Sequence, residues 1–339
     1  MRGTVNRNGG ASIVSAITRR AAVMAGAALM FPRSSMAQAA WPTRVVKIIV
    51  PLGPGSGADI AARMLGERLQ RMWGKPVVIE NRPGGNGIAA ITGFLTANDD
   101  HTLFYGAAAT FTVHPYQMET IPYDFKRDIL PIAQATVTIA VVAVPASSAV
   151  NTMPEFVKWA KDNPGKLNAA LVPGIAEITF DKFVKVENLQ ITKVPYRNIV
   201  DAVSDASVGR VQFLSTAFAI VQPSVEGRTI RVIAITNNER FPGLPDVATC
   251  AEQGVPSMAY EGLAGLFGGK LLSADLRARI GEDVLRAMGD PVIKQRIEAT
   301  GQMVLPGGAA AFQASIDGQI EEIKRSAAYL GLNAGKVAP

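Results

Sequence analysis

The feature that most constrains the fold is a regular alternation of short apolar runs with helical patterns. The run VVKIIVP (45–51) has the length and composition of a buried strand, and residues 59–72 then repeat apolar side chains at helical spacing. A second strand at 77–80, a helix at 87–97 and a third strand at 102–110 follow. This β-α-β-α-β order predicts a parallel sheet with right-handed crossover connections.

The stretch VTIAVVAVPA (137–146) interrupts that alternation, because it is a long β-rich run with no helix before it. We interpret it as the passage of the chain into a second lobe, where the alternation restarts. The elements expected there are helices at 153–162, 177–187, 199–207 and 218–226 and strands at 166–171, 190–194, 210–215 and 230–235.

The C-terminal part of the chain predicts a loop with a short helix and then helices at 273–288, 290–300 and 309–330. It has too few strands for a sheet of its own, so we expect it to pack on the first lobe. The predicted fold class is therefore α/β with two lobes, each a mainly parallel sheet flanked by helices. The expected boundaries are 40–140 with 237–339 for lobe 1 and 141–236 for lobe 2, with a ligand between the lobes.

Residues 1–39 have the pattern of a cleavable signal peptide. The pair Arg19-Arg20 precedes a short apolar run, 21–31, and Ala37-Gln38-Ala39 then offers small residues for cleavage. The apolar run is too short to span a bilayer, so we predict an exported, periplasmic protein rather than an anchored one. Paired arginines favour the twin-arginine export route, although the Sec route would accept a similar segment.

Composition excludes several function classes. The chain carries a net charge of +6, but residues 1–39 hold five arginines and no acid, so the remainder carries +1 and does not resemble a nucleic-acid binder. The single cysteine, Cys250, excludes an internal disulfide framework. The two histidines, His101 and His114, argue against a histidine-built metal site. We expect neither a metal nor a cofactor.

The glycine-rich turn GPGSGAD (53–59) between the first strand and the first helix has three interpretations. It matches G-x-G-x-x-A, and Glu80 ends the next strand about where a ribose-binding acid of a dinucleotide site would stand. It also resembles a helix cap, with Ser56 before the helix and Asp59 in its first turn. Finally, backbone N–H groups at 55–58 could bind a small anion at the helix N-terminus.

The segment IIVPLGPGSGADIAARMLGERLQRMWGKPVVIENRPGGNG closely resembles the opening of Bug-type receptors, the periplasmic solute-binding proteins of tripartite tricarboxylate transporters. Further matches are NPGKLN (163–168), LPDVATCAEQGVP (244–256) and TGQMVLPGG (300–308), so the resemblance extends over residues 41–335. It implies a two-lobed, type II periplasmic binding protein whose ligand is usually a small carboxylate. It implies no catalysis.

The resemblance places the ligand between facing glycine-rich loops whose backbone groups hold its carboxylate. The candidate ligand-binding residues of the first lobe are Pro54, Gly55, Ser56, Gly57, Ala58 and Asp59, together with Ala107, Ala108 and Thr110 after the third strand. Those of the facing loop are Pro173, Gly174, Ile175, Ala176 and Glu177.

The facing loop departs most from the family pattern, which is roughly S-A-G-x-G-S-x-x-H-L. Pro173 stands where the family has glycine, and it has no N–H to donate. Ile175 replaces a second glycine, Ala176 replaces a serine, and Glu177 adds a charge. Family members also commonly carry serine or threonine where this chain has alanines at 107 and 108. The resemblance therefore implies that several donors for a carboxylate are missing here.

The remaining candidates each have a structural and a functional interpretation. Glu177 would either cap its helix or face the cleft, where it would favour a neutral or amine-bearing ligand. Arg197 could bind a ligand carboxylate in bidentate fashion or pair with Glu177. Tyr196 would form a pocket wall or pack in the core. Ser215 and Thr216 end a strand of the second lobe and would point toward the cleft.

Three functions remain open at this point. The first is a non-enzymatic receptor that captures a small organic acid or related solute and delivers it to the membrane permease subunits of a transporter, and we expect it to be a monomer. The second is an exported oxidoreductase that binds NAD at the glycine turn. The third is a sensory receptor, which would use the same cleft.

Overall fold

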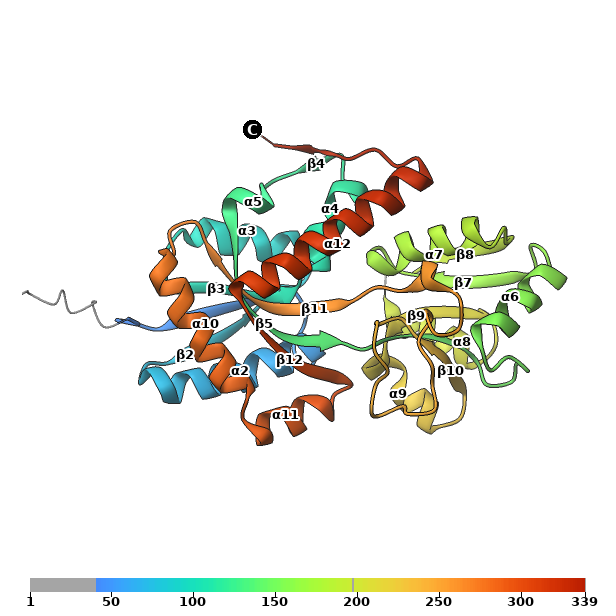
Figure 1. Cartoon of the computed structure of the whole chain (residues 1–339), viewed down its shortest axis with the longest axis horizontal. Coiled ribbons are helices and arrows are strands. Elements are labelled where there is room, and N and C mark those ends of the chain that lie inside the picture. The colour runs from blue at the N-terminus through green and yellow to red at the C-terminus, as the bar shows by residue number, and fades with distance from the viewer. Residues whose placement is uncertain (1–40, 197, 339) are drawn as a thin grey trace, which may run out of the picture. The chain divides into compact units, whose positions relative to one another are not determined.

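The structure, a computed structural model, describes residues 41–196 and 198–338 and contains two mixed β-sheets with helices around them (Figure 1). The predicted signal peptide lies outside the described residues. The first sheet has, in spatial order, the strands β12 (Gln302–Gly308), β5 (Ile129–Thr138), β11 (Gly262–Gly269), β3 (Thr102–Ala107), β1 (Val46–Val50) and β2 (Val77–Asn81). The second has β10 (Ile230–Ile235), β6 (Ala140–Pro145), β9 (Phe213–Ala217), β7 (Leu167–Leu171) and β8 (Ile191–Pro195).

Helices connect and cover these strands. Those that belong with the first sheet are α2 (Gly57–Trp73), the short η2 (Gly85–Gly87), α3 (Ile88–Ala97), α4 (Ala109–Gln117), α5 (Phe125–Asp128), α10 (Ala274–Met288), α11 (Pro291–Glu298) and α12 (Ala309–Leu330). Those around the second sheet are α6 (Met153–Asp162), α7 (Ile175–Val186), α8 (Ile199–Ser207), α9 (Phe218–Glu226) and the short η3 (Pro256–Met258). A small ladder joins β4 (Thr120–Ile121) to β13 (Lys336–Val337).

The two-lobed α/β fold is confirmed, but each sheet is mixed rather than mainly parallel. Parallel pairing joins β1 to β2 and β3 in the first sheet, and β7 to β8 and β9 in the second. The other pairs, which involve β5, β6, β10, β11 and β12, are antiparallel. These strands either carry the chain between the sheets or return to the first sheet from the far end of the sequence, so they are not joined by simple β-α-β crossovers.

The long run at 137–146 is the point where the chain changes sheets, as the sequence suggested. β5 ends at Thr138 in the first sheet and β6 begins at Ala140 in the second, so that Ile139 alone separates them. The return connection lies beside this crossing. The Asn237 side chain, 2% exposed, accepts a hydrogen bond from Ala140 N (3.0 Å) and donates one to Thr138 O (3.1 Å).

From Gly262 onward the C-terminal part packs on the first lobe, as expected, and it contributes two strands to the first sheet that the sequence did not predict. The segment before it does not follow the prediction, because Phe241, Cys250 and Met258 pack in the apolar cores of the second lobe. β11 lies between β5 and β3, and β12 forms the edge next to β5, while α10 and α12 pack against β5 (Figure 1). The β11 sequence GLAGLFGG looks like a loop. A Cβ at Gly265 would lie 2.3 Å from Ala133 O and 2.7 Å from the Phe312 ring, so the glycine permits close packing.

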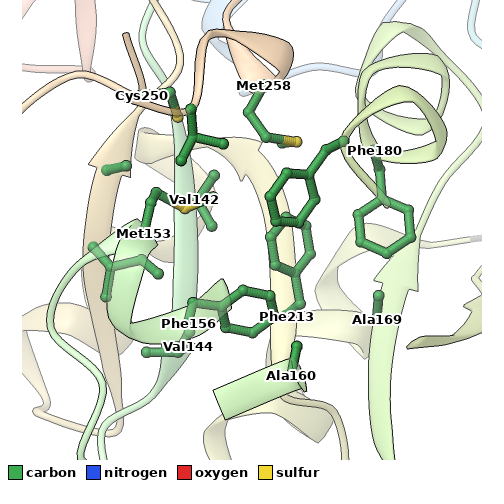
Figure 2. Close-up of a cluster of buried hydrophobic side chains, with 14 of the residues drawn as sticks. Val142, Val144, Met153, Phe156, Ala160, Ala169, Phe180, Phe213, Cys250 and Met258 are labelled. Carbon is green, nitrogen blue, oxygen red and sulfur yellow. The ribbon is translucent and has the colours of Figure 1, made fainter. Parts of the chain in front are cut away.

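Each lobe has its own aromatic core. In the first, Phe267 packs against Phe111 and Phe312, with ring centroids 5.0 and 5.1 Å away. In the second, Phe213 of β9 packs against Phe180 of α7 and Phe156 of α6, at 4.9 and 5.2 Å (Figure 2). These contacts fix α7, and therefore the loop before it, on the second sheet.

Cys250 is buried in the core of the second lobe, where burial raises its thiol pKa to about 12 (Figure 2). It therefore behaves as a small apolar residue. Residues Pro42–Pro339 group into one compact unit. The lobe boundaries at 140 and 236 therefore stay a prediction.

Candidate functional site

The turn between β1 and α2 is a helix cap braced by one buried carboxylate. Ser56 is the N-cap of α2, and its hydroxyl accepts a hydrogen bond from Asp59 N (3.3 Å). The Asp59 carboxylate, 2% exposed, accepts bonds from Gly55 N (2.9 Å), the Arg63 Nε (3.0 Å) and the Asn81 Nδ2 (2.9 Å). The cap interpretation is therefore confirmed, except that the acid reaches back to Gly55 rather than to the N-cap residue.

The negative charge of Asp59 is used in the hydrogen bonds that hold the loop. Burial by itself raises the pKa of the carboxyl, but the bonds from Arg63, Gly55 and Asn81 outweigh it, so the pKa lies below its ordinary value. Since its oxygens are occupied by these donors, Asp59 shapes the loop rather than offering a charge to a ligand. The N–H of Gly55 is likewise used within the loop.

The amides of Gly57 and Ala58 remain as donors in the first turn of α2. The first amides of a helix have no intrahelical acceptor, and none of the hydrogen bonds among the described residues satisfies these two. The loop is also held from behind by a residue that the sequence did not single out. Gln302, at the start of β12, donates from its Nε2 to the Gly57 carbonyl oxygen at 2.9 Å.

The loop after β3 lies beside the first loop. A Cβ at Gly87 would lie 2.7 Å from the Thr110 methyl group and 3.5 Å from Pro51, so the turns after β1, β2 and β3 converge there. Ala108 is fully buried and its N–H donates to Leu263 O (2.8 Å), which commits that residue to packing. Ala107 and Thr110 are partly exposed and remain the candidates from this loop. α4 starts here without a side-chain cap.

The facing loop, 172–177, is held by different means. Gly174 is the N-cap of α7, with φ 149°, and no side chain caps this helix. The carbonyl oxygen of Gly174 accepts a hydrogen bond from Nε2 of Gln117, at the end of α4 (3.2 Å). Ile175 packs near Val113 of α4 and Ile323 of α12 in a small apolar cluster. Elements of both sheets therefore meet at the start of α7.

Glu177 forms an ion pair within the second lobe. Its Oε1 lies 3.6 Å from Nζ of Lys193 on β8, and the same ammonium group pairs with Asp181 at 2.9 Å. Glu177 is also the third residue of α7, where the helix dipole stabilises an acid. Both observations favour the structural interpretation of this residue.

The remaining predicted residues are distributed over the second lobe. The Tyr196 hydroxyl donates to Asp205 of α8 (2.7 Å), and burial together with Asp205 raises its pKa to about 12. That contact favours packing over a pocket wall. Arg197 lies outside the described residues. Ser215 and Thr216 are buried and point to opposite faces of β9, so only one of them can face a given side of the sheet.

The sequence analysis missed several buried polar groups, one of which, the Tyr260 phenol, lies near Ser215 of β9. Burial raises the pKa of the Tyr260 phenol, and the nearby hydroxyls of Ser215 and Thr236 oppose that rise. η3 packs against α7, and the buried Oγ of Ser257 on η3 has no hydrogen-bond partner among the described residues. Oε1 of Gln117 is also buried and without such a partner. Unpartnered buried acceptors are characteristic of places where a ligand or water binds.

Two cavities among the described residues lie elsewhere. One of about 360 Å³ is lined by Asn151, Arg231 and Gln253 at the β10 edge of the second sheet. Another of about 310 Å³ lies between Phe218 of α9 and Glu298 of α11. Neither includes a predicted ligand-binding residue. Hydrogen-bond donors and acceptors decide where a small polar solute binds. The candidate site is therefore the set of loops that carry free backbone N–H groups rather than these cavities.

The position of Glu80 argues against the dinucleotide interpretation. Glu80, which would bind the ribose, forms ion pairs with Lys47 (3.1 Å) and Arg82, and these bonds hold its pKa below the ordinary value. Arg82 thus has a structural role in this ion pair. Among residues 41–196 and 198–338 we find no cluster of metal-binding side chains. Nor does any helix in that part of the chain have the length and apolarity needed to cross a membrane.

Comparison with known proteins identifies the family of this chain. The family model described as "Tripartite tricarboxylate transporter family receptor" matches residues 61–329. The UPF0065 protein in the tcbD-tcbE intergenic region of a Pseudomonas species is 29% identical over 297 residues, which are 86% of this chain and 88% of the relative. Protein BugT of Bordetella pertussis is 28% identical over 220 residues, 64% of this chain and 68% of BugT.

Solved structures share the fold. One described as a periplasmic transporter has a TM-score of 0.71 and 26% identity, and the match covers 86% of this chain and 96% of that protein. A Rhodopseudomonas palustris protein with adipate has a TM-score of 0.75 at 23% identity, covering 86% and 99%. MatC from the same species, with bound malate, has a TM-score of 0.68 at 22% identity, covering 86% and 98%. The chain belongs to the tripartite tricarboxylate transporter receptor family.

Proposed function

We propose that this chain is a periplasmic receptor, not an enzyme, which binds a small carboxylate between the loops at 53–59, 106–110 and 172–177. The observation that carries the proposal is that two of the three helices that begin at these loops, α4 and α7, have no side-chain cap at their N-cap residues, Ala108 and Gly174. The third, α2, is capped by Ser56, but the N–H groups of Gly57 and Ala58 have no acceptor among the described residues. Uncapped N–H groups and the positive end of the helix dipole favour an anion.

Helices placed elsewhere provide the contrast. α6, α8, α10 and α11 are each capped by a polar side chain, from Thr152, Asn198, Ser273 and Asp290 respectively. Polar N-cap side chains are thus common in this chain, and their absence from α4 and α7 leaves backbone N–H groups for a ligand. Since side chains at the facing loop offer few donors, backbone amides would carry most of the recognition.

The acids found with two proteins of the same fold support a size and class for the ligand. Adipate and malate, the acids found with two proteins of the same fold, are aliphatic dicarboxylates of six and four carbons. We infer a ligand of that class for this chain. We also infer that the protein acts as a monomer and that the lobes close around the ligand. The closed form would then deliver it to the membrane permease subunits of the transporter.

Native mass spectrometry of the purified mature protein, followed by calorimetric titration with adipate and malate, tests the proposal. We expect a co-purifying small acid, or saturable binding of at least one of the two. NAD serves as the control in a thermal-shift assay, where it should leave the melting temperature unchanged. Stabilisation by NAD with no response to organic acids would reverse the assignment in favour of an oxidoreductase.

A sensory role uses the same binding step and differs in the partner. Cross-linking of the ligand-loaded receptor in membranes that contain the permease subunits separates the two. A receptor for transport should cross-link to the permease and do so more in the presence of the acid. Cross-linking to a sensor kinase instead would support the sensory role.

A further inference from the structure

Gln302 occupies the space behind the glycine loop that a side chain at position 57 would otherwise fill. A Cβ at Gly57 would lie 3.1 Å from the Gln302 Nε2 and 3.3 Å from its Cδ. Gly57 does not have a positive φ, so its backbone conformation does not require glycine. Glycine at position 57 therefore leaves room for the Gln302 side chain, which is 3% exposed.

The orientation of the Gln302 amide is fixed from both ends. The Gly57 carbonyl oxygen can only accept a hydrogen bond, so the nitrogen of the Gln302 amide must face it. Oε1 of Gln302 accepts from the Thr136 hydroxyl at 3.3 Å. Since Thr136 has a single proton, it accepts in turn from the Tyr105 phenol at 3.1 Å. Tyr105 and Thr136 are both fully buried.

These bonds form a chain that runs in one direction, from the Tyr105 phenol through Thr136 and Gln302 to the Gly57 carbonyl. Burial raises the pKa of Tyr105 to about 12, and the bond to Thr136 only partly offsets this, so the phenol keeps its proton at ordinary pH. Every member of the chain donates to the next one. Hydrogen bonds arranged in this way polarise one another, which strengthens the last donor.

The last hydrogen bond of this series, from Gln302 to the Gly57 carbonyl, acts on a peptide group that can bind a ligand. The Gly57 carbonyl and the Ala58 N–H belong to the same planar peptide unit, so a bond that fixes the oxygen also fixes the direction of the N–H. Withdrawal of electron density by Gln302 also makes the Ala58 N–H a better donor. Ala58 N is one of the two amides of this loop left without an acceptor among the described residues.

We propose that Gln302 is a positioning residue of the binding site, which orients and polarises the Gly57–Ala58 peptide so that the Ala58 N–H can bind a ligand carboxylate. The effect of Gln302 on ligand binding rests on the proposed function, but its effect on the loop at 53–59 can be measured without a ligand. It also gives the C-terminal strand β12 a direct part in the site, although Gln302 lies 245 residues from Gly57 in sequence.

The test uses the isosteric variant Gln302→Met and a matched control, Gln134→Met. Gln134 is a buried glutamine on β5 whose Nε2 donates to the Leu305 carbonyl of β12 at 3.1 Å, so it joins the same two strands without contacting the glycine loop. Hydrogen exchange is followed in the peptide that covers the first turn of α2. We expect Gln302→Met to speed exchange there about fivefold, the effect of one lost hydrogen bond, and Gln134→Met to change it less than about twofold.

Thr136→Val provides a second, milder variant that removes the hydroxyl but keeps the shape. It should speed exchange in the same peptide by about twofold, and the double variant with Gln302→Met should exchange no faster than Gln302→Met alone. Equal changes in the Gln302→Met and Gln134→Met proteins, or additive effects of the two substitutions, would overturn the proposal. If Gln302→Met does not fold, the comparison of Thr136→Val with Gln134→Met decides the question.

Calorimetric titration with adipate and malate supplies the functional half of the test. For an acid that binds the unmodified protein, Gln302→Met should weaken the affinity about fivefold while Gln134→Met leaves it unchanged. Unchanged affinity in Gln302→Met would contradict the role in binding. Binding of neither acid to the unmodified protein would count against the proposed carboxylate function, whereas the exchange result would still decide whether Gln302 positions the loop.

Discussion

The loops at 53–59 and 172–177 both precede a helix that follows a parallel strand, yet they are built in different ways. The first is braced by side chains, since the buried Asp59 holds the backbone of its own loop and Ser56 caps the helix. The second has no side-chain cap, and its carbonyl at Gly174 is held by Gln117 from the other lobe. The first loop is thus braced by residues of its own lobe, whereas the second is completed by a contact between the lobes.

The largest expected effect comes from removing the brace of the first loop. Asp59→Ala leaves the N–H of Gly55, the Asn81 amide and the Arg63 guanidinium without their common acceptor. We expect a loss of about 3 kcal/mol in the free energy of unfolding, measured by urea denaturation at pH 7. Asp181→Ala is the control from the second lobe. Its carboxylate pairs with Lys193 at a partly exposed site, so the loss should stay below about 1 kcal/mol.

The same brace predicts a pH dependence. Burial acts to raise the pKa of Asp59, but its bonds to Arg63, Gly55 and Asn81 lower it below the unperturbed 3.8. A lowered pKa stabilises the folded state above the unfolded value and loses that contribution as the pH falls through the folded value. The stability gap between the unmodified protein and Asp59→Ala should therefore be constant above pH 5 and shrink below about pH 3.8. A gap that widened in acid would contradict the assignment.

A pair of glycine substitutions compares the backbones of the two loops. Gly55 has φ 82° and Gly174 has φ 149°, and a Cβ added at either would meet no atom within 4 Å. Any loss therefore reports backbone strain. Gly174→Ala should lose about 2 kcal/mol, because φ 149° with ψ −166° is accessible almost only to glycine. Gly55→Ala should lose about 1 kcal/mol. The reverse order in thermal denaturation would show that the second loop adapts more readily than the first.

The smallest expected effect is that of Glu177→Gln. The residue is partly exposed and shares Lys193 with Asp181, so the variant should lose only about 0.5 kcal/mol. The effect of Glu177→Gln on ligand binding tests whether this carboxylate faces the ligand. Adipate affinity should change by less than about twofold if the carboxylate serves only its ion pair. A tenfold gain in affinity would mean instead that Glu177 faces the ligand and repels it.

Local patterns predicted most of the secondary structure and little of the site. The helices at 153–162, 199–207 and 218–226 have the predicted bounds because their apolar spacing and flanking residues are strong. α4 was missed, since Thr110, Thr112 and Val113 are β-branched and Pro115 lies within the helix, and both features disfavour a helix locally. β11 and β12 were missed because their glycines suggest loops. Their strand conformation depends on packing against β5, which no local pattern reveals.

The candidate site shows the same limit. The capping role of Ser56 follows from a four-residue pattern and was predictable. The bond from Asn81 to Asp59 and that from Gln302 to Gly57 join residues 22 and 245 positions apart, so only the fold brings them together. Resemblance to a family suggested the loops as candidates, but it did not reveal that a Cβ at Gly57 would lie 3.1 Å from Nε2 of Gln302 or that Tyr196 bonds to Asp205.

The crossing at Ile139 has a mechanical consequence. Asn237 bonds to the backbone on both sides of Ile139, and it sits on the return connection, so the outgoing and returning chains are fastened side by side. Two segments joined in this way cannot slide past each other without breaking those bonds, whereas a shared twist leaves them intact. We therefore expect relative motion of the lobes to be a rotation at this crossing rather than a slide, because a slide would break both bonds.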